Sequence, residues 1–232
     1  MKKSNKKFIW LVLIIVVVCA VLVYTFFFKK EKNVITEVKV IDNIDKYDYV
    51  LYEDKTKLYN ENFENLKAVL NSETVDYDEY AKVISKLFVI DFYDLDSKVT
   101  NTDIGGLQFI YPTEKDSFVN ASKNTMYKYV ESNVYGNRKE KLPSVKSVEV
   151  TNLKNEKFES EKVSDENAYI TTLSVDYVVD LEYPKEVILT IVHSDNKLYI
   201  IEMAVSKVTF EKIESKKEID IVIQYKFEKI SN

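Results

Sequence analysis

The sequence predicts an α+β fold, in which an N-terminal transmembrane helix precedes a domain of three helices packed on a curved, mainly antiparallel sheet. Three observations support this prediction. First, Phe8 to Phe28 contains no charged residue, proline or glycine. Second, apolar residues recur at helical spacing between residues 56 and 136. Third, apolar residues alternate with polar ones after Pro143, as in strands with one buried face. Because every amphipathic element must bury one face, we expect the helices to pack on the sheet.

The apolar run at residues 8–28 is expected to cross a membrane. A helix of this length spans about 31 Å, which matches a hydrocarbon core of about 30 Å. Four lysines precede the run, so the positive-inside rule places the N-terminus in the cytoplasm. A cleaved signal peptide is the alternative, but its apolar core is usually about 7–15 residues long. We therefore predict a cytoplasmic tail at residues 1–7, the span at 8–28, a stalk at 29–45 and an extracytoplasmic domain at 46–232.

Composition limits the possible functions of this outer part. The chain is 46% apolar and 13% aromatic, which is enough for a packed core. Its net charge is −5, and setting aside the seven lysines and one glutamate before residue 33 leaves −11 for the rest. Nucleic acid repels such a domain, so we expect no nucleic-acid partner. Cys19 is the only cysteine, which excludes a disulfide or a thiolate metal site in the outer part.

Two helices follow a short strand predicted at Lys46 to Glu53. Thr56 is the expected N-cap of the first helix, which runs to about Asn71. Its apolar stripe is Tyr59, Phe63, Leu66 and Leu70. The second helix begins with Asp76 and Glu79 in capping-box spacing and should lie deepest in the core. Its stripe is Tyr80, Val83, Ile84, Leu87, Phe88 and then Leu95.

Three aspartates follow that stripe, at Asp91, Asp94 and Asp96. Their spacing and the missing glycine do not fit a calcium loop. We expect them to be solvated and to terminate the second helix.

A third helix is predicted after a glycine pair. Gly105 and Gly106 indicate a turn or a close approach of the backbone, and the motifs of a phosphate-binding loop are absent. Pro112 suits the first turn of the helix, and Gly136 is placed to end it. One side of this helix would carry Phe118, Ser122, Thr125, Tyr129 and Ser132.

The remaining sequence predicts strands. One begins at Val148 and Val150. A long strand with one wet face is expected from Tyr169 to Tyr183, through Leu173, Val175, Tyr177, Val179 and Leu181. Val187 to His193 and Leu198 to Val205 should form a hairpin around a polar turn. The last strand, Glu218 to Glu228, alternates Ile219, Ile221, Ile223, Tyr225 and Phe227 with polar residues.

Residue types that carry chemistry are scarce, so we select no catalytic, cofactor-binding or metal-binding residue. His193 is the only histidine, and we expect it to be hydrogen-bonded or solvent-facing beside the predicted turn. Without a second histidine, zinc sites and histidine-activated nucleophiles are disfavoured. The seventeen tyrosines fit core positions best, although tyrosine is also common at interfaces.

Leading helices, a run of antiparallel strands and one N-terminal membrane helix with a small basic tail resemble the nuclear transport factor 2-like (cystatin-like) fold. The resemblance covers about Lys46 to Asn232 in element order and is to the membrane-anchored members found in type IV secretion and Gram-positive conjugation machines. It implies a non-enzymatic scaffold or adaptor whose partners are the membrane, other envelope proteins and, in a homo-oligomer, further copies of the chain. Soluble relatives with enzymatic activity place an Asp or Tyr in a pocket mouth, where Asp176, Tyr177 or Tyr225 could lie. A domain that binds or senses a small ligand or the envelope is the alternative.

Overall fold

The structure, a computed structural model, describes residues 38–205 and 223–225. The predicted tail, the predicted transmembrane helix and most of the predicted stalk lie outside these residues. Within the described ranges no helix is long and apolar enough to cross a membrane. The helices are α2 (Lys57–Leu70), α3 (Tyr77–Tyr93) and α4 (Lys115–Asn124), with short 3-10 helices at Asp45–Tyr47, Leu107–Phe109 and Pro112–Glu114. The strands are β1 (Val40–Ile44), β2 (Tyr49–Tyr52), β3 (Val145–Glu159), β4 (Ser164–Tyr177), β5 (Glu186–Ser194), β6 (Lys197–Val205) and β7 (Ile223–Tyr225).

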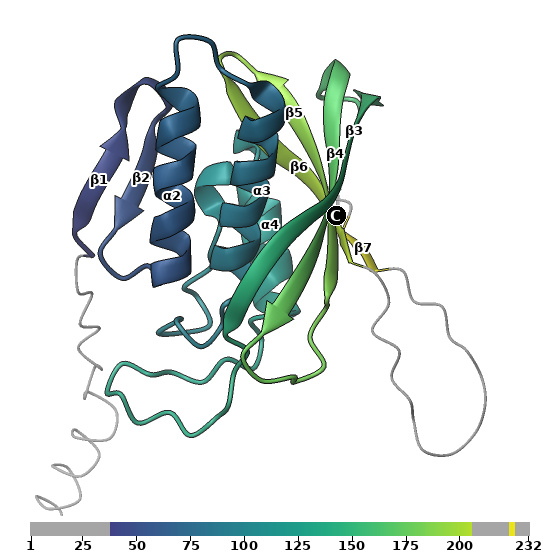
Figure 1. The fold of residues 1–232 in the computed structure, drawn as a ribbon. Helices are drawn as coiled ribbons and strands as arrows, with labels where there is room; N and C mark the ends of the chain where they lie inside the picture. The colour runs from purple at the N-terminus through teal and green to yellow at the C-terminus, as the bar shows by residue number, and fades with distance from the viewer. Residues whose placement is uncertain (1–37, 206–222, 226–232) are drawn as a thin grey trace, which may run out of the picture. The chain divides into compact units, whose positions relative to one another are not determined.

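The main sheet has five antiparallel strands in the order β3-β4-β5-β6-β7, so each strand lies beside its neighbour in sequence (Figure 1). Asp195 adopts a left-handed conformation in the tight turn between β5 and β6, which confirms the predicted hairpin. β1 and β2 form a separate two-stranded sheet. The α+β class, the three helices and the antiparallel pairing are thereby confirmed.

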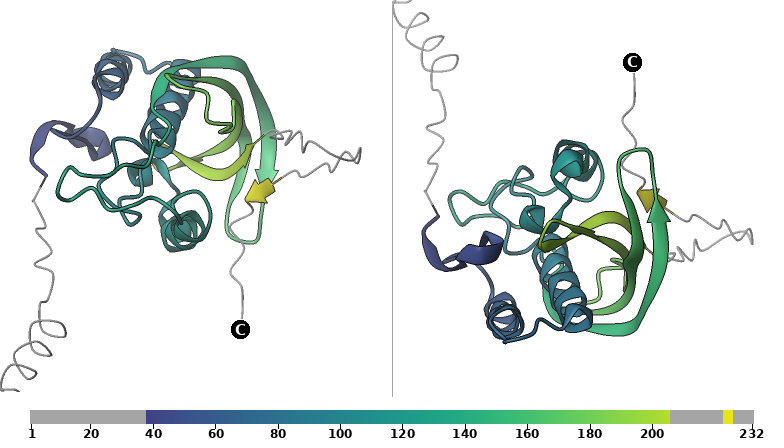
Figure 2. Two further views of the ribbon diagram at one scale, coloured as in Figure 1. Left: turned by 90° about the horizontal axis from the view of Figure 1, so that it is seen from below. Right: turned by 90° about the horizontal axis from the view of Figure 1, so that it is seen from above.

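Helix α3 is the centre of the domain, and the sheet curves around it (Figure 2). Twelve of its residues are buried, as expected for the helix predicted to lie deepest. The hydroxyls of Ser85 on α3 and Thr171 on β4 are 3.0 Å apart at the helix–sheet contact. Helix α2 packs mainly against α3 and not on the sheet. The prediction that all three helices share one face of the sheet is therefore wrong for α2.

The first two helices begin where their capping residues predict. Thr56 Oγ1 accepts a hydrogen bond from the N–H of Tyr59 at 3.2 Å. Asp76 Oδ1 accepts from the N–H groups of Asp78 and Glu79 at 3.0 and 3.1 Å. The buried residues of α2 are Tyr59, Phe63, Leu66 and Leu70, which is the predicted stripe.

The third helix is shorter than predicted. Pro112 opens a 3-10 turn that leads into α4, and Phe118 and Ser122 are buried as expected, but the helix ends at Asn124. The side chains of Asn124 and Thr125 bond the carbonyls four residues earlier, at 2.8 and 2.7 Å. Such bonds offer the backbone an alternative to the helix. Tyr129 and Ser132 therefore lie in a loop, and Gly136 turns this loop instead of ending a helix.

Strand boundaries also differ from the prediction. β4 begins earlier than Tyr169 and ends at Tyr177, and a turn follows in which Glu182 is left-handed and its N–H donates to the Asp180 carboxylate. Val40–Ile44, expected to be stalk, pairs with β2. Of the predicted last strand, Ile223–Tyr225 pairs with β6, while Ile219, Ile221 and Phe227 lie outside the described residues.

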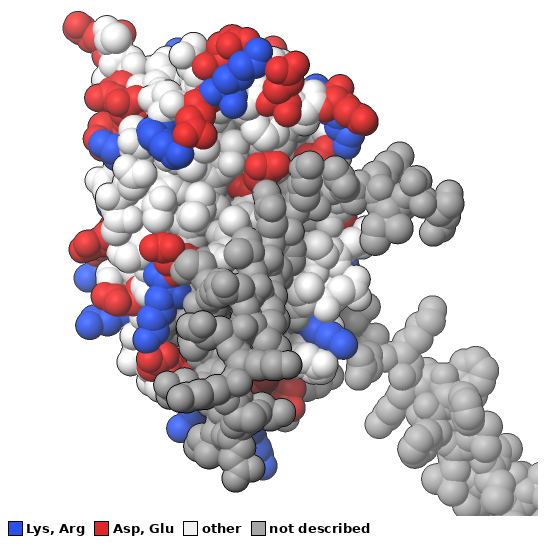
Figure 3. Space-filling view, turned by 90° about the vertical axis from the view of Figure 1, so that its right-hand side faces the viewer, with Lys and Arg blue, Asp and Glu red and all other residues white. Residues whose placement is uncertain are grey.

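The polar half of β3 forms a long hairpin with β4 beyond the rest of the sheet. Ion pairs line it, joining Lys154 to Glu156 and Lys157 to both Glu159 and Glu166. Figure 3 shows acidic and basic side chains interspersed along the rim of this side of the domain. Lysines and three register shifts along β3 protect its outer edge from pairing with another strand.

Candidate functional site

The residues that the sequence offers for chemistry are bonded to structural partners or are exposed to solvent. Asp165 Oδ2 accepts from the backbone N–H of His193 at 2.7 Å and lies 2.9 Å from its ring Nδ1. Asp176 is exposed, and the Tyr177 hydroxyl donates to the Pro184 carbonyl at 2.8 Å. No group of three or more histidine, cysteine or acidic residues in the described part of the chain could hold a metal ion.

One small pocket lies between α3, α4 and β6. It measures about 10 Å³, which is room for roughly one water molecule. Its lining is largely apolar and consists of Phe92, Phe118, Ala121, Ser122, Thr125, Met126 and Met203. This pocket is too small for an organic ligand.

The most distinctive surface feature is the segment at residues 127–142, which we call the tyrosine loop. Tyr129 and Tyr135 are 73% and 78% exposed, the largest values among the large apolar and aromatic side chains of the described residues. Val134 in the loop is also exposed, and so is Val99. The Asn133 N–H donates to the carbonyl of Val99 at 2.7 Å, which places Val99 beside the loop. Exposed aromatic rings on a loop are typical of contact surfaces.

Arg138 anchors the tyrosine loop. Its side chain is only 3% exposed and donates to the backbone carbonyls of Lys98 and Asp96, each at 2.7 Å. The Arg138 N–H donates to Asn133 Oδ1 at 3.0 Å, and the Glu131 N–H donates to the Glu140 carboxylate at 3.0 Å. Gly136 adopts φ +67° within this turn. These bonds fix the backbone of the loop, from which the exposed rings project, to the rest of the domain.

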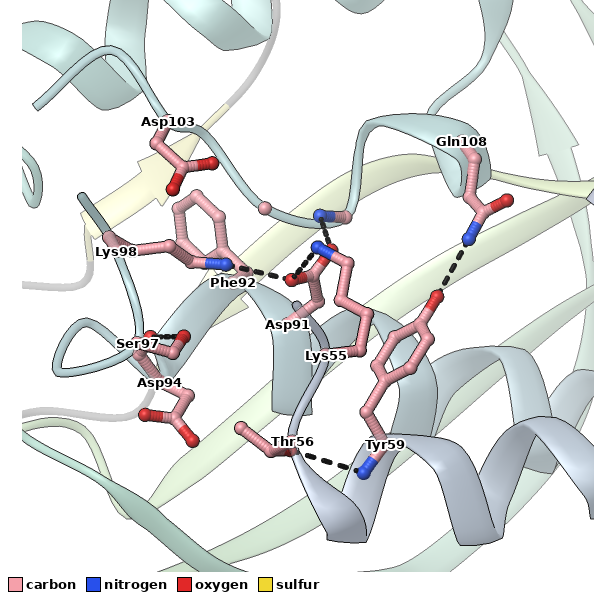
Figure 4. A network of polar contacts seen from close by, with 12 residues as sticks. Lys55, Thr56, Tyr59, Asp91, Phe92, Asp94, Ser97, Lys98, Asp103 and Gln108 are labelled. Carbon is pink, nitrogen blue, oxygen red and sulfur yellow. Dashed lines mark hydrogen bonds and ion pairs between the residues drawn. The ribbon is translucent and has the colours of Figure 1, made fainter. Parts of the chain in front are cut away.

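Lys98, whose carbonyl accepts from Arg138, also belongs to a buried charge network around Asp91 (Figure 4). Asp91 Oδ1 accepts from the ammonium groups of Lys98 at 2.7 Å and Lys55 at 2.9 Å. Its other oxygen, Oδ2, accepts from the Gly106 N–H at 2.8 Å. Asp91 and Asp94 are buried, so the prediction that they are solvated is wrong, whereas Asp96 is exposed. Asp94 is the C-cap of α3, so the predicted end of this helix is confirmed.

The two buried aspartates have opposite electrostatic environments. Burial raises the pKa of Asp91, but the charges of Lys98 and Lys55 outweigh burial and lower this pKa to about 2. Burial raises the pKa of Asp94 to about 6, against the opposing charge of Lys98. Asp91 is therefore a permanent anion at neutral pH, whereas Asp94 changes its charge in mildly acidic conditions.

Close packing around Asp91 explains the glycine pair. A methyl group on Gly105 would overlap the carbonyl oxygen of Asp91, and Gly106 has φ +77° with the Phe88 ring against it. The Gly105 N–H donates to the Tyr127 hydroxyl at 3.2 Å, and this hydroxyl donates to the Phe92 carbonyl at 2.7 Å. The close approach predicted for the glycines is confirmed, and Tyr127 joins it to the tyrosine loop.

Sequence patterns did not reveal the tyrosine loop, because helical spacing extended the third helix through it. One signal was available. Gly136 and the charged run from Arg138 to Lys141 follow two tyrosines, a composition that favours an exposed turn. Comparison of the chain with models of protein families, with curated proteins and with solved structures found no significant match.

Proposed function

We propose that this chain is a non-enzymatic, membrane-tethered adaptor that acts by contact in a cell-envelope assembly, and that the tyrosine loop is one of its contact surfaces. The supporting observation is the pairing of two highly exposed tyrosines with the buried anchor Arg138. Holding exposed aromatic rings in a fixed arrangement reduces the entropy lost on binding. Rings this exposed add little to the packing of the domain, so a role in contact explains them better than a structural role.

The proposed topology follows from the sequence. Residues 8–28 form the membrane anchor, the N-terminus is cytoplasmic, and the domain beginning near Val38 lies outside the cell. Protease added to intact protoplasts should digest the domain and leave an N-terminal tag protected. The reverse pattern of protection would contradict this topology.

The nuclear transport factor 2-like fold remains our proposal for the architecture. It is supported by α3 lying across a curved antiparallel sheet. The separate β1–β2 sheet and the position of α2 outside α3 are features that this resemblance did not anticipate.

The adaptor role is tested in cells with the double variant Tyr129→Ala/Tyr135→Ala. We expect normal protein levels, because both side chains are exposed, together with loss of cellular function. Deletion of residues 1–28 should abolish the same function. His193→Ala, which changes the only histidine, is the matched control and should leave this function intact. Loss of function in the His193 variant with an unaffected tyrosine variant would reverse the proposal in favour of an enzyme.

In the same cells, crosslinking in native membranes should join the domain to other envelope proteins. Recovery of the chain alone with a bound small molecule would instead support the ligand-binding alternative.

A further inference from the structure

We propose that the tyrosine loop lies against the surface of an anionic phospholipid membrane, with Tyr129 and Tyr135 among the headgroups. This inference rests on the proposed function, because it takes the membrane anchor from it. It adds that the loop contacts lipid, so that protein partners of the adaptor bind to other faces of the domain.

Charge is the first argument. Residues 33–232 carry −11, yet the tyrosine loop has four cationic and two anionic side chains. Arg138 is buried in its carbonyl contacts, so the exposed cations are Lys128, Lys139 and Lys141. An anionic membrane repels the domain as a whole and attracts this loop. The loop is therefore the part of the described domain that we expect to turn toward such a surface.

The chemistry of the exposed rings is the second argument. Tyrosine prefers the membrane–water interface, where its ring meets apolar atoms and its hydroxyl stays hydrated. The Lys128 ammonium lies 5.0 Å from the centre of the Tyr129 ring, so the loop presents a ring and a cation together. Arg138 fixes the backbone of the loop in advance, which reduces the ordering required on contact.

Location is the third argument. Figures 1 and 2 show the tyrosine loop on the part of the domain where the described chain begins, near Val38. Residues 29–37 separate this point from the end of the predicted span, and nine residues reach at most about 30 Å when extended. The loop thus lies on the same part of the domain as the first described residues, where the tether to the proposed anchor begins.

The test uses the full chain in vesicles of phosphatidylcholine, alone or mixed with phosphatidylglycerol. Cys19→Ser removes the only cysteine, and Ser132→Cys then carries a fluorescent label between the two exposed tyrosines. A matched label at Glu161→Cys marks the β3–β4 turn, at the other end of the domain. The measurement is quenching of each label by lipids that carry a quencher on the headgroup.

We expect strong quenching of the label at position 132 in the anionic vesicles, weaker quenching in phosphatidylcholine alone, and none at position 161. Replacing Lys128, Lys139 and Lys141 by Gln should weaken the lipid contact about fivefold for each lysine. Tyr129→Ser/Tyr135→Ser should abolish the remaining quenching. Equal quenching at positions 132 and 161, or none at 132, would overturn the inference.

A label on the native Cys19 separates this inference from the proposed topology. Acyl-chain quenchers should quench the Cys19 label if residues 8–28 span the membrane. If this label is quenched and the label at position 132 is not, the anchor stands and lipid contact by the loop is refuted. If the Cys19 label is not quenched, the membrane anchor fails and the inference fails with it. Crosslinks from position 132 to a protein instead of lipid would also refute the inference.

Discussion

The ammonium of Lys98 donates to the carboxylate of Asp91 at 2.7 Å, and both side chains are almost fully buried, at 3% and 8% exposure. Lys55 donates to the same oxygen, so two cations depend on one anion. The backbone carbonyl of Lys98 in turn accepts from Arg138. The Asp91–Lys98 pair therefore connects the inside of α3 to the anchor of the tyrosine loop.

Asp91→Asn should lower the free energy of unfolding by about 3–5 kcal/mol, because it leaves two lysines without a buried counter-charge. Asp96→Asn, at the exposed end of the cluster, should change it by less than about 1 kcal/mol. Chemical denaturation of the full chain in detergent, followed by circular dichroism, measures both values. Similar losses in the two variants would contradict the central role of Asp91.

The free energy of unfolding should depend on pH through the titration of both Asp91 and Asp94. Because the pKa of Asp91 is lowered to about 2, its contribution is present above the ordinary value of 3.8 and is lost as the pH falls toward 2. Because the pKa of Asp94 is raised to about 6, the folded state binds the extra proton between 3.8 and 6, and stability falls as the pH rises through this range. Asp94→Asn should remove this fall. Denaturation midpoints at a series of pH values measure it, and an unchanged slope would refute the assignment.

Arg138→Ala should release the tyrosine loop, because two backbone carbonyls lose their donor. We expect trypsin to cleave after Lys139 and Lys141 much faster than in the natural chain, with a loss of about 1–3 kcal/mol in global stability. Lys139→Ala is the control, since its side chain is exposed, and cleavage after Lys141 should keep its natural rate. Unchanged cleavage in Arg138→Ala would show that the loop has other anchors.

Two tyrosines of the loop should respond differently to loss of the hydroxyl. Tyr127→Phe leaves the buried Gly105 N–H and Phe92 carbonyl without this partner and should reduce stability by about 1–3 kcal/mol. Tyr135→Phe changes only an exposed hydroxyl and should stay within about 0.5 kcal/mol. Thermal unfolding of the two variants provides the comparison, and a larger effect at Tyr135 would contradict the structure.

Gly105→Ala should prevent normal folding, because its methyl group meets the Asp91 backbone and cannot move away from it. Gly136→Ala should cost only about 1 kcal/mol, since this position has φ +67° but open space around it. The yield of folded protein and its unfolding midpoint measure the difference. A mild effect of Gly105→Ala would show that the 105–106 turn can shift.

Local signals explain which parts of the fold the sequence predicted. Thr56 and Asp76 cap helices through bonds to residues two or three positions away, so spacing alone reveals them. The sequence suggests a solvated Asp91 because its partners, Lys55 and Lys98, come from segments with no fixed spacing to it. Helical spacing hides the tyrosine loop, and its anchor cannot be predicted either, since Arg138 bonds backbone carbonyls that no residue pattern marks. The polar residues of β3 do not alternate with apolar ones, so they carry no local strand signal. They are held in the strand by cross-strand pairing with β4, which a local pattern does not reveal.

The Asp91 cluster also bears on the order of folding. Strands β3 to β6 pair with sequence neighbours, so hairpins can form early from local contacts. Asp91 instead needs Lys55, which is 36 residues away, and the turn at Gly106. We expect this cluster to form after the folding transition state. Interactions that form at that stage slow the rate of unfolding and leave the rate of folding unchanged. For the extracytoplasmic domain that we propose, which proteases can reach, a slow rate of opening would protect the chain for longer than equilibrium stability alone.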